Sequence, residues 1–151
     1  MNVLAIGAHP DDVEMACSGT LAKCVKRGDK VIVCHASTGN LGHVVIPPDE
    51  LTKIRAEEAK KAGGLAGIEV IGGMFDDLNI FDGNKAARDK LVDVIKYAQP
   101  DFIITHNPDD YMPDHTAVSR LVFDASFAAT LPNYKSRYEK AAALVPIYYM
   151  D

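Results

Sequence analysis

The sequence predicts an α/β domain in which a parallel sheet is covered by helices on both faces. Apolar runs typical of strands alternate with segments of helical periodicity, and this alternation implies parallel strands joined by crossover helices. Residues of the types that bind ligands or take part in catalysis are concentrated in the segments that follow the expected strands. With 151 residues, of which 48% are hydrophobic and 25% charged, the chain is expected to form one domain, 1–151.

Each expected element follows from periodicity and from the residues that interrupt it. The apolar runs expected to form strands are 2–8, 31–36, 69–74, 102–105 and 144–149. The segments expected to form helices are 13–27, 49–65, 85–98 and 115–131. Gly28 closes the first helix, and Asp49, after two prolines, is expected to cap the second.

The composition excludes several classes of partner. The net charge is −5 and the basic residues are scattered, so we expect no nucleic-acid partner and a small-molecule substrate instead. No basic leader and no apolar stretch long enough to span a bilayer is present, so we expect a cytoplasmic protein without a membrane partner. The three cysteines, Cys17, Cys24 and Cys34, lack CxxC spacing and are expected to be reduced thiols.

Two clusters of His and Asp follow two of the expected strands. The first is His9-Pro10-Asp11-Asp12, and the second spans 106–115 and ends in His115. Loops that leave the carboxyl ends of parallel strands share one rim of the sheet, which is where open α/β sheets bind ligands. The two clusters are therefore expected to form one site.

The residue types in these clusters favour a hydrolytic zinc centre. Such a centre takes about three protein ligands and leaves one position open for water, and His9, Asp12 and His115 could supply the set. Adjacent residues on an extended turn point in different directions, so one of Asp11 and Asp12 would bind and the other would act as general base. The alternative is that 10–12 only caps the following helix. A second histidine at another strand end favours the metal.

Helix faces indicate two further polar positions. At 3.6 residues per turn, one side of the second expected helix carries Leu51, Ile54, Ala62 and Leu65. Glu58 falls within this stripe beside Arg55, either as an ion pair at the edge of the core or to aim Arg55 into the crevice. Glu14 also faces inward and is expected to support His9 from beneath.

The stretch 8–14, together with Pro113-Asp114-His115 and Val118, resembles the zinc-dependent N-acetylglucosaminyl deacetylases of the PIG-L/LmbE family. Further matches in the family's order are 38–42, Arg55 with Glu58, and 78–83. The resemblance implies a Rossmann-like sheet and a hydrolase that removes the acetyl group from an N-acetylated amino sugar or its conjugate.

The resemblance also implies roles for individual residues. His9, Asp12 and His115 would bind one Zn²⁺ per chain, and Asp11 would be the general base. Arg55 and Asp82 would contact hydroxyls of the acetylated sugar. Outside the metal ligands, Asp114 would orient His115 through its second ring nitrogen, and Asp110 would add a further contact.

Two departures from the family pattern leave alternatives open. Met112 stands where the family usually has a histidine that polarises the amide oxygen or protonates the leaving group. The chain also stops just after 145–149, so we expect it to lack the family's C-terminal portion and to leave apolar surface at the last strand, uncovered unless a homo-oligomer packs there. The alternatives are a weak or inactive zinc-binding or assembly subunit, and a hydrolase of a different small amide. A nucleotide-binding module is disfavoured, because the turn 7–12 is not G-x-G-x-x-G.

Overall fold

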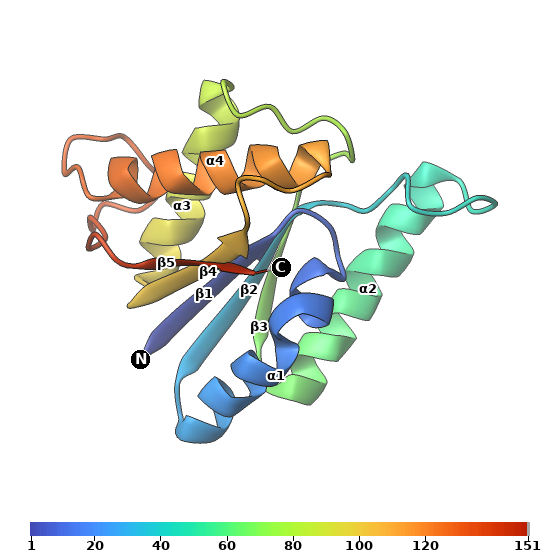
Figure 1. Cartoon of the computed structure of the whole chain (residues 1–151), viewed down its shortest axis with the longest axis horizontal. Helices are drawn as coiled ribbons and strands as arrows, with labels where there is room; N and C mark the ends of the chain where they lie inside the picture. The colour runs from blue at the N-terminus through green and yellow to red at the C-terminus, as the bar shows by residue number, and fades with distance from the viewer. Residues whose placement is uncertain (151) are drawn as a thin grey trace.

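The computed structural model describes residues 1–150, which form a five-stranded parallel sheet and four helices (Figure 1). The strands are β1 (Asn2–Gly7), β2 (Lys30–Ser37), β3 (Glu69–Phe75), β4 (Phe102–His106) and β5 (Ile147–Met150). The helices are α1 (Asp12–Arg27), α2 (Pro48–Ala66), α3 (Lys85–Ala98) and α4 (Pro113–Ala129). The predicted α/β class with a parallel Rossmann-like sheet is confirmed.

The strand order fixes where a ligand can bind. The order is β3-β2-β1-β4-β5, so the chain builds outward from β1 to β3 and then returns to place β4 on the other side of β1. The direction of the strand order reverses between β1 and β4. In open α/β sheets the crevice outside the carboxyl ends of the strands at such a point binds ligands. Both His/Asp clusters follow these two strands.

The hydrophobic core lies on both faces of the sheet. On one face, under α3 and α4, Leu4 and Ile6 of β1 pack with Ile103 of β4. On the other face, under α1, Val3 and Ala5 are equally buried (Figure 1). Burial on both faces explains why the strands read as continuous apolar runs. No helix among residues 1–150 has the length and apolarity needed to cross a bilayer.

The sequence interpretation of α2 was wrong in two respects. The side chain of Asp49 does not cap the helix, which begins at Pro48 after Pro47, and Asp49 lies in the first turn, where a carboxylate favourably meets the helix dipole. Leu65 is 92% exposed and does not belong to the packed face. The helix instead packs closely on β3 at Gly63. A Cβ at this position would collide with the side chain of Val70, so only glycine permits this close contact.

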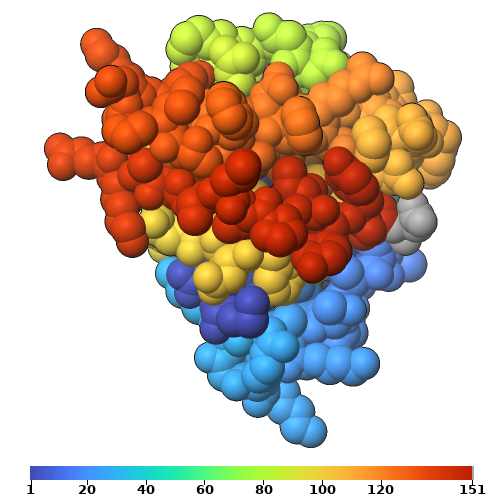
Figure 2. All heavy atoms as spheres, turned by 60° about the vertical axis from the view of Figure 1, so that its left-hand side comes forward, coloured from blue at the N-terminus to red at the C-terminus, as the bar shows by residue number. Residues whose placement is uncertain are grey.

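Strand β5 forms one edge of the sheet and leaves aromatic surface in contact with solvent. Tyr148 and Tyr149 are exposed, and the segment that carries them lies on the molecular surface (red in Figure 2). Tyr148 packs edge-on against Phe102 of the neighbouring strand, with ring centroids 5.7 Å apart. The apolar surface expected at the last strand is therefore confirmed.

The two-sided core predicts a large difference between buried and exposed apolar residues. Ile103→Ala removes a fully buried side chain from the central sheet and should lower the free energy of unfolding by about 2–5 kcal/mol. Leu65→Ala, at an exposed position, should change it by less than about 0.5 kcal/mol. Urea unfolding followed by circular dichroism measures both. Equal losses in the two variants would contradict this description of the core.

Candidate metal centre

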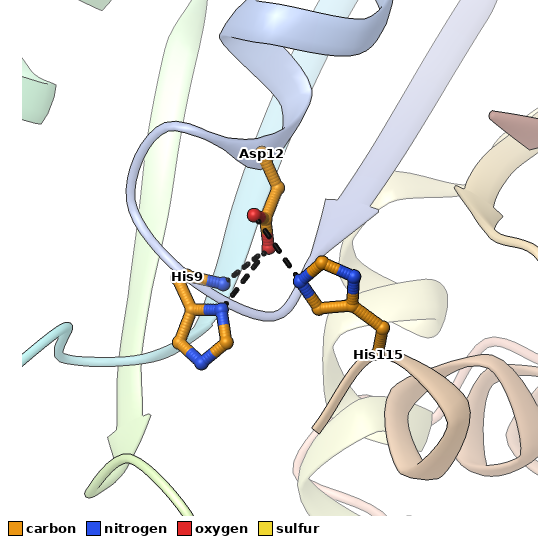
Figure 3. Close-up of side chains that lie close together, drawn as sticks. All are labelled: His9, Asp12 and His115. Carbon is orange, nitrogen blue, oxygen red and sulfur yellow. Dashed lines mark hydrogen bonds and ion pairs between the residues drawn. The ribbon is translucent and has the colours of Figure 1, made fainter. Parts of the chain in front are cut away.

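Three side chains from two distant segments of the sequence meet at the switch point of the sheet (Figure 3). His9 lies in the loop after β1, Asp12 is the first residue of α1, and His115 lies in the first turn of α4. His9 Nδ1 is 3.5 Å from Asp12 Oδ2, and His115 Nε2 is 3.3 Å from Asp12 Oδ1. One ligand atom from each residue lies within 4.8 Å of the others. The structure therefore brings together the ligand set expected from the sequence.

The start of α1 directs Asp12 into this cluster. Asp12 Oδ2 accepts the backbone N–H of His9 at 2.7 Å, which holds the carboxylate against the loop. Asp11 occupies the N-cap position but makes no side-chain capping hydrogen bond. The alternative interpretation, that residues 10–12 only cap the helix, is thus not supported by the geometry.

In His9 and in His115, the ring nitrogen that does not face Asp12 lies beside a second carboxylate. Asp114 Oδ2 lies 3.0 Å from His9 Nε2, and Asp110 Oδ2 lies 3.0 Å from His115 Nδ1. The expected pairing of Asp114 with His115 was therefore wrong. Consecutive residues of a helix point about 100° apart, so Asp114 cannot face the residue that follows it. Asp110 precedes the helix and reaches His115 from the loop.

The ring nitrogens of His9 and His115 that face Asp12 are placed to bind a metal ion. His115 Nε2 is buried and makes no hydrogen bond, although the opposite ring nitrogen is paired with Asp110. His9 repeats the pattern, with one nitrogen toward Asp12 and the other on Asp114. Metal-binding imidazoles usually have their second nitrogen on a carboxylate or carbonyl. With one carboxylate and two such nitrogens, this donor set suits Zn²⁺.

The electrostatics of the cluster also favour a cation. Burial lowers the pKa of His9, but hydrogen bonds to Asp12 and Asp114 more than offset this effect and raise it to about 9. Burial likewise opposes the charge of His115, yet Asp12 and Asp110 raise its pKa above the usual value. The carboxylates of Asp12, Asp110 and Asp114 thus stabilise a positive charge on the groups that lie between them. A divalent ion would supply this charge in place of the imidazole protons.

His106 also lies in this cluster. In the sequence it belongs to the second His/Asp segment, 106–115, but it was not expected among the metal ligands. Its ring stacks on that of His115, with centroids 3.8 Å apart and planes inclined by 13°. His106 Nε2 accepts the N–H of Ala8 at 2.9 Å and lies 3.1 Å from Asp12 Oδ2. His106, Asp110 and His115 form a second group that could hold an ion. Its place in the cluster could have been inferred from its position as the last residue of β4, which is the neighbour of β1.

Arg55 contacts the loop that carries Asp11. Its guanidinium forms an ion pair with Asp11 Oδ2 at 2.7 Å and donates to the carbonyls of Pro10 and Gly39. A Cβ at Gly39 would collide with this guanidinium, so the glycine is needed for its close approach. Neither expectation for Glu58 holds, because Glu58 is exposed and the acidic partner of Arg55 is Asp11.

Two other expected site residues lie against different partners. Glu14 does face inward, but its oxygens are 3.1 and 3.2 Å from His35 Nε2 and it does not support His9. His35 belongs to β2, on the face that α1 covers, which places it within reach. Asp82 pairs with Arg120 of α4 at 3.1 Å, and both line a separate cavity of about 530 Å³. Contact of Asp82 with a sugar remains a prediction.

The fold and this site define a class of α/β protein with a His/Asp centre at the sheet's switch point. The chain belongs to the PIG-L family: the family model described as GlcNAc-PI de-N-acetylase matches residues 4–126.

Relatives of two activities are similar to this chain. A 1D-myo-inositol 2-acetamido-2-deoxy-alpha-D-glucopyranoside deacetylase from Corynebacterium diphtheriae is 31% identical over 140 residues, covering 74% of this chain and 47% of that protein. A 4-oxalmesaconate hydratase from Pseudomonas putida is 26% identical over 154 residues, covering 97% of this chain and 59% of the hydratase. The chain thus spans about half to three-fifths of the length of these curated relatives.

A solved structure confirms the fold. The N,N'-diacetylchitobiose deacetylase from Pyrococcus horikoshii superposes with a TM-score of 0.81 and 26% identity, over 87% of this chain and 51% of that one. The family is one of deacetylases, and a hydratase is among the relatives of this chain.

The proposed ligand set predicts which histidines retain a metal. His9→Ala and His115→Ala should lose bound zinc, because each removes a nitrogen that faces Asp12. His43→Ala, an exposed histidine outside both metal-binding groups, should keep it. Elemental analysis of zinc-loaded, desalted protein measures the content. Loss of zinc in His106→Ala but not in His9→Ala would instead place the ion in the second group.

Proposed function

We propose that this chain carries the metal-binding core of a hydrolase that removes the acetyl group from an N-acetylated amino sugar or its conjugate, releasing acetate. The observation that carries the proposal is the arrangement of His9 and His115, each with one nitrogen toward Asp12 and the other on a carboxylate. Membership of a deacetylase family and the similarity to sugar deacetylases support it.

Different residues of the chain would bind the metal, orient its ligands and accept a proton in such a reaction. His9, Asp12 and His115 would hold a zinc ion, which would supply a bound water with a pKa near 7 and would polarise a carbonyl group. Asp110 and Asp114 hold the two imidazoles in fixed orientations. Asp11 is exposed beside the cluster and makes no capping bond, so its carboxylate is available to accept a proton. Its ion pair with Arg55 holds it there.

The residue at 112 favours a second candidate, hydration. The side chain of Met112 has no proton to give to a departing amine. A hydratase adds water and releases no amine, and the hydratase relative is similar over almost the whole chain. Under this alternative the same cluster would bind the water, whose hydroxyl would add to one carbon of a carbon–carbon double bond, and the proton taken from that water would be returned to the other carbon.

The proposed base can be separated from the ligands by one substitution. Asp11→Asn should retain zinc and lower the rate of acetate release from N-acetylglucosamine conjugates by roughly 10²–10⁴-fold, as is typical for loss of a general base. Elemental analysis and an acetate assay on the same preparation measure both. If Asp11→Asn loses its zinc, the roles of Asp11 and Asp12 are exchanged. If its rate is unchanged, Asp11 is not the base.

A substitution at position 112 separates the two candidate activities. Met112→His places an imidazole one helical turn before His115 and should raise single-turnover amine release, since an acid contributes roughly 10²–10⁴-fold. Met112→Leu, at matched zinc content, is the control and should not differ from the unaltered chain. Both proteins and the unaltered chain are also assayed for loss of ultraviolet absorbance of an unsaturated carboxylic acid. Hydration without acetate release would favour the second candidate, and neither activity would favour a non-catalytic subunit.

A further inference from the structure

A cavity beside α4 lies outside the candidate metal centre. Its volume of about 530 Å³ falls within the range of sites that hold small molecules. Its walls come from four parts of the chain, namely the loop after β3, the loop after β4, helix α4 and strand β5. His9, Asp12 and His115 do not line it, so the proposed reaction leaves this cavity without a role.

Two carboxylates and one guanidinium line the cavity, so its charged side chains carry a net charge of −1. Asp82 and Arg120 form an ion pair at 3.1 Å and balance one another. Asp124 lies one helical turn after Arg120 and takes part in no ion pair among residues 1–150. Arg88 of α3 attracts Asp124 only at longer range, since its Nε donates to the hydroxyl of Tyr134. The carboxylate of Asp124 is therefore the uncompensated charge of the cavity.

Two aromatic rings and a buried hydroxyl also line the cavity. Phe123 of α4 is 62% exposed and Tyr149 of β5 is 49% exposed, so neither ring is enclosed in the core. Ser119 is 1% exposed, and its Oγ has no hydrogen-bond partner within residues 1–150. A buried hydroxyl without a partner is unfavourable, and a ligand with a hydrogen-bonding group at this wall would supply the partner.

We propose that this cavity binds an organic ammonium ion with an aliphatic or aromatic body. Ring faces of Phe and Tyr attract cations, and the carboxylate of Asp124 supplies the opposite charge. An anion would have to displace Asp82 from Arg120 and would be repelled by Asp124. The net charge of −5 on the chain also favours the approach of a cation. The site is independent of the proposed function, because it shares none of the proposed zinc ligands.

Binding of two probes with the same ring tests the preference for a cation. Benzylammonium carries the positive charge, and benzyl alcohol is its neutral counterpart. On the unaltered zinc-loaded chain, titrations followed by NMR should give a Kd for benzylammonium roughly fivefold below that for benzyl alcohol, as a cation near aromatic rings and a carboxylate implies. No binding of benzylammonium, or equal Kd values for the two probes, would overturn the inference.

Substitutions in α4 place the binding in this cavity. Asp124→Asn should bring the two Kd values together, because it removes the uncompensated charge and keeps the shape of the side chain. Phe123→Leu should raise the Kd for benzylammonium, since the aromatic face is lost. Phe127→Leu is the matched control, because Phe127 is an exposed ring of the same helix that does not line the cavity. Circular dichroism checks that each variant is folded. An unchanged preference in Asp124→Asn would reject the site.

A variant without zinc separates this cavity from the metal centre, to which an amine could also bind. His9→Ala, which is expected to lose zinc, should bind benzylammonium as the unaltered chain does. Binding that disappears with the zinc would place the probe on the metal and refute the inference. Displacement of benzylammonium by N-acetylglucosamine would also refute it, because the cavity would then belong to the substrate site. Acetate release measured on the same preparations reports on the proposed function alone.

Discussion

The carboxylate of Asp12 is the contact on which the candidate site depends. It accepts the N–H of His9, lies against the rings of His106 and His115, and so joins the loop after β1 to β4 and α4. These elements meet because β1 and β4 are neighbours in the sheet although a hundred residues separate them in sequence. A half-buried carboxylate between the rings of His9 and His115 favours positive charge at this point, carried by protons on these two rings or by an ion. The site's chemistry thus follows from the strand order.

Asp11 and Arg55 form a second unit that the loops hold together. Arg55 extends from α2 to the loop after β1, and its guanidinium packs on Gly39 in the loop after β2. The resemblance assigns proton transfer to Asp11 and substrate contact to Arg55. Because one ion pair joins these two residues, the two expected roles would be coupled: a hydroxyl or an anion that engaged Arg55 would compete with Asp11 for its guanidinium. The φ of 139° at Asp11, uncommon for a residue with a Cβ, is part of the same arrangement.

Periodicity was sufficient to predict the fold, since the strands are short apolar runs, which are buried in β1, β2 and β4, and most helices end at a glycine or near a proline. The ligand cluster could be predicted too, because strand ends bring His9 and His115 to one rim whatever the loop details. The carboxylates that pair with the histidines could not be predicted in the same way. Whether Asp110 or Asp114 meets His115, and whether Glu14 meets His9 or His35, depends on side-chain directions at loop and helix starts. These directions follow from backbone angles that a sequence pattern does not specify.

Hydrolysis of an amide and hydration of a double bond share the activation of water and differ in where the proton goes. In the proposed function the cluster around Asp12 would serve the shared step, and both a deacetylase and a hydratase are among the relatives of this chain. The transfer of the proton, in which the two reactions differ, would depend on groups that face the open side of the cluster. Met112 lies at the N-cap of α4, next to Tyr111 in sequence and one helical turn before His115. A change at the end of the loop before α4 would therefore be expected to alter the reaction while His9, Asp12 and His115 stay as they are.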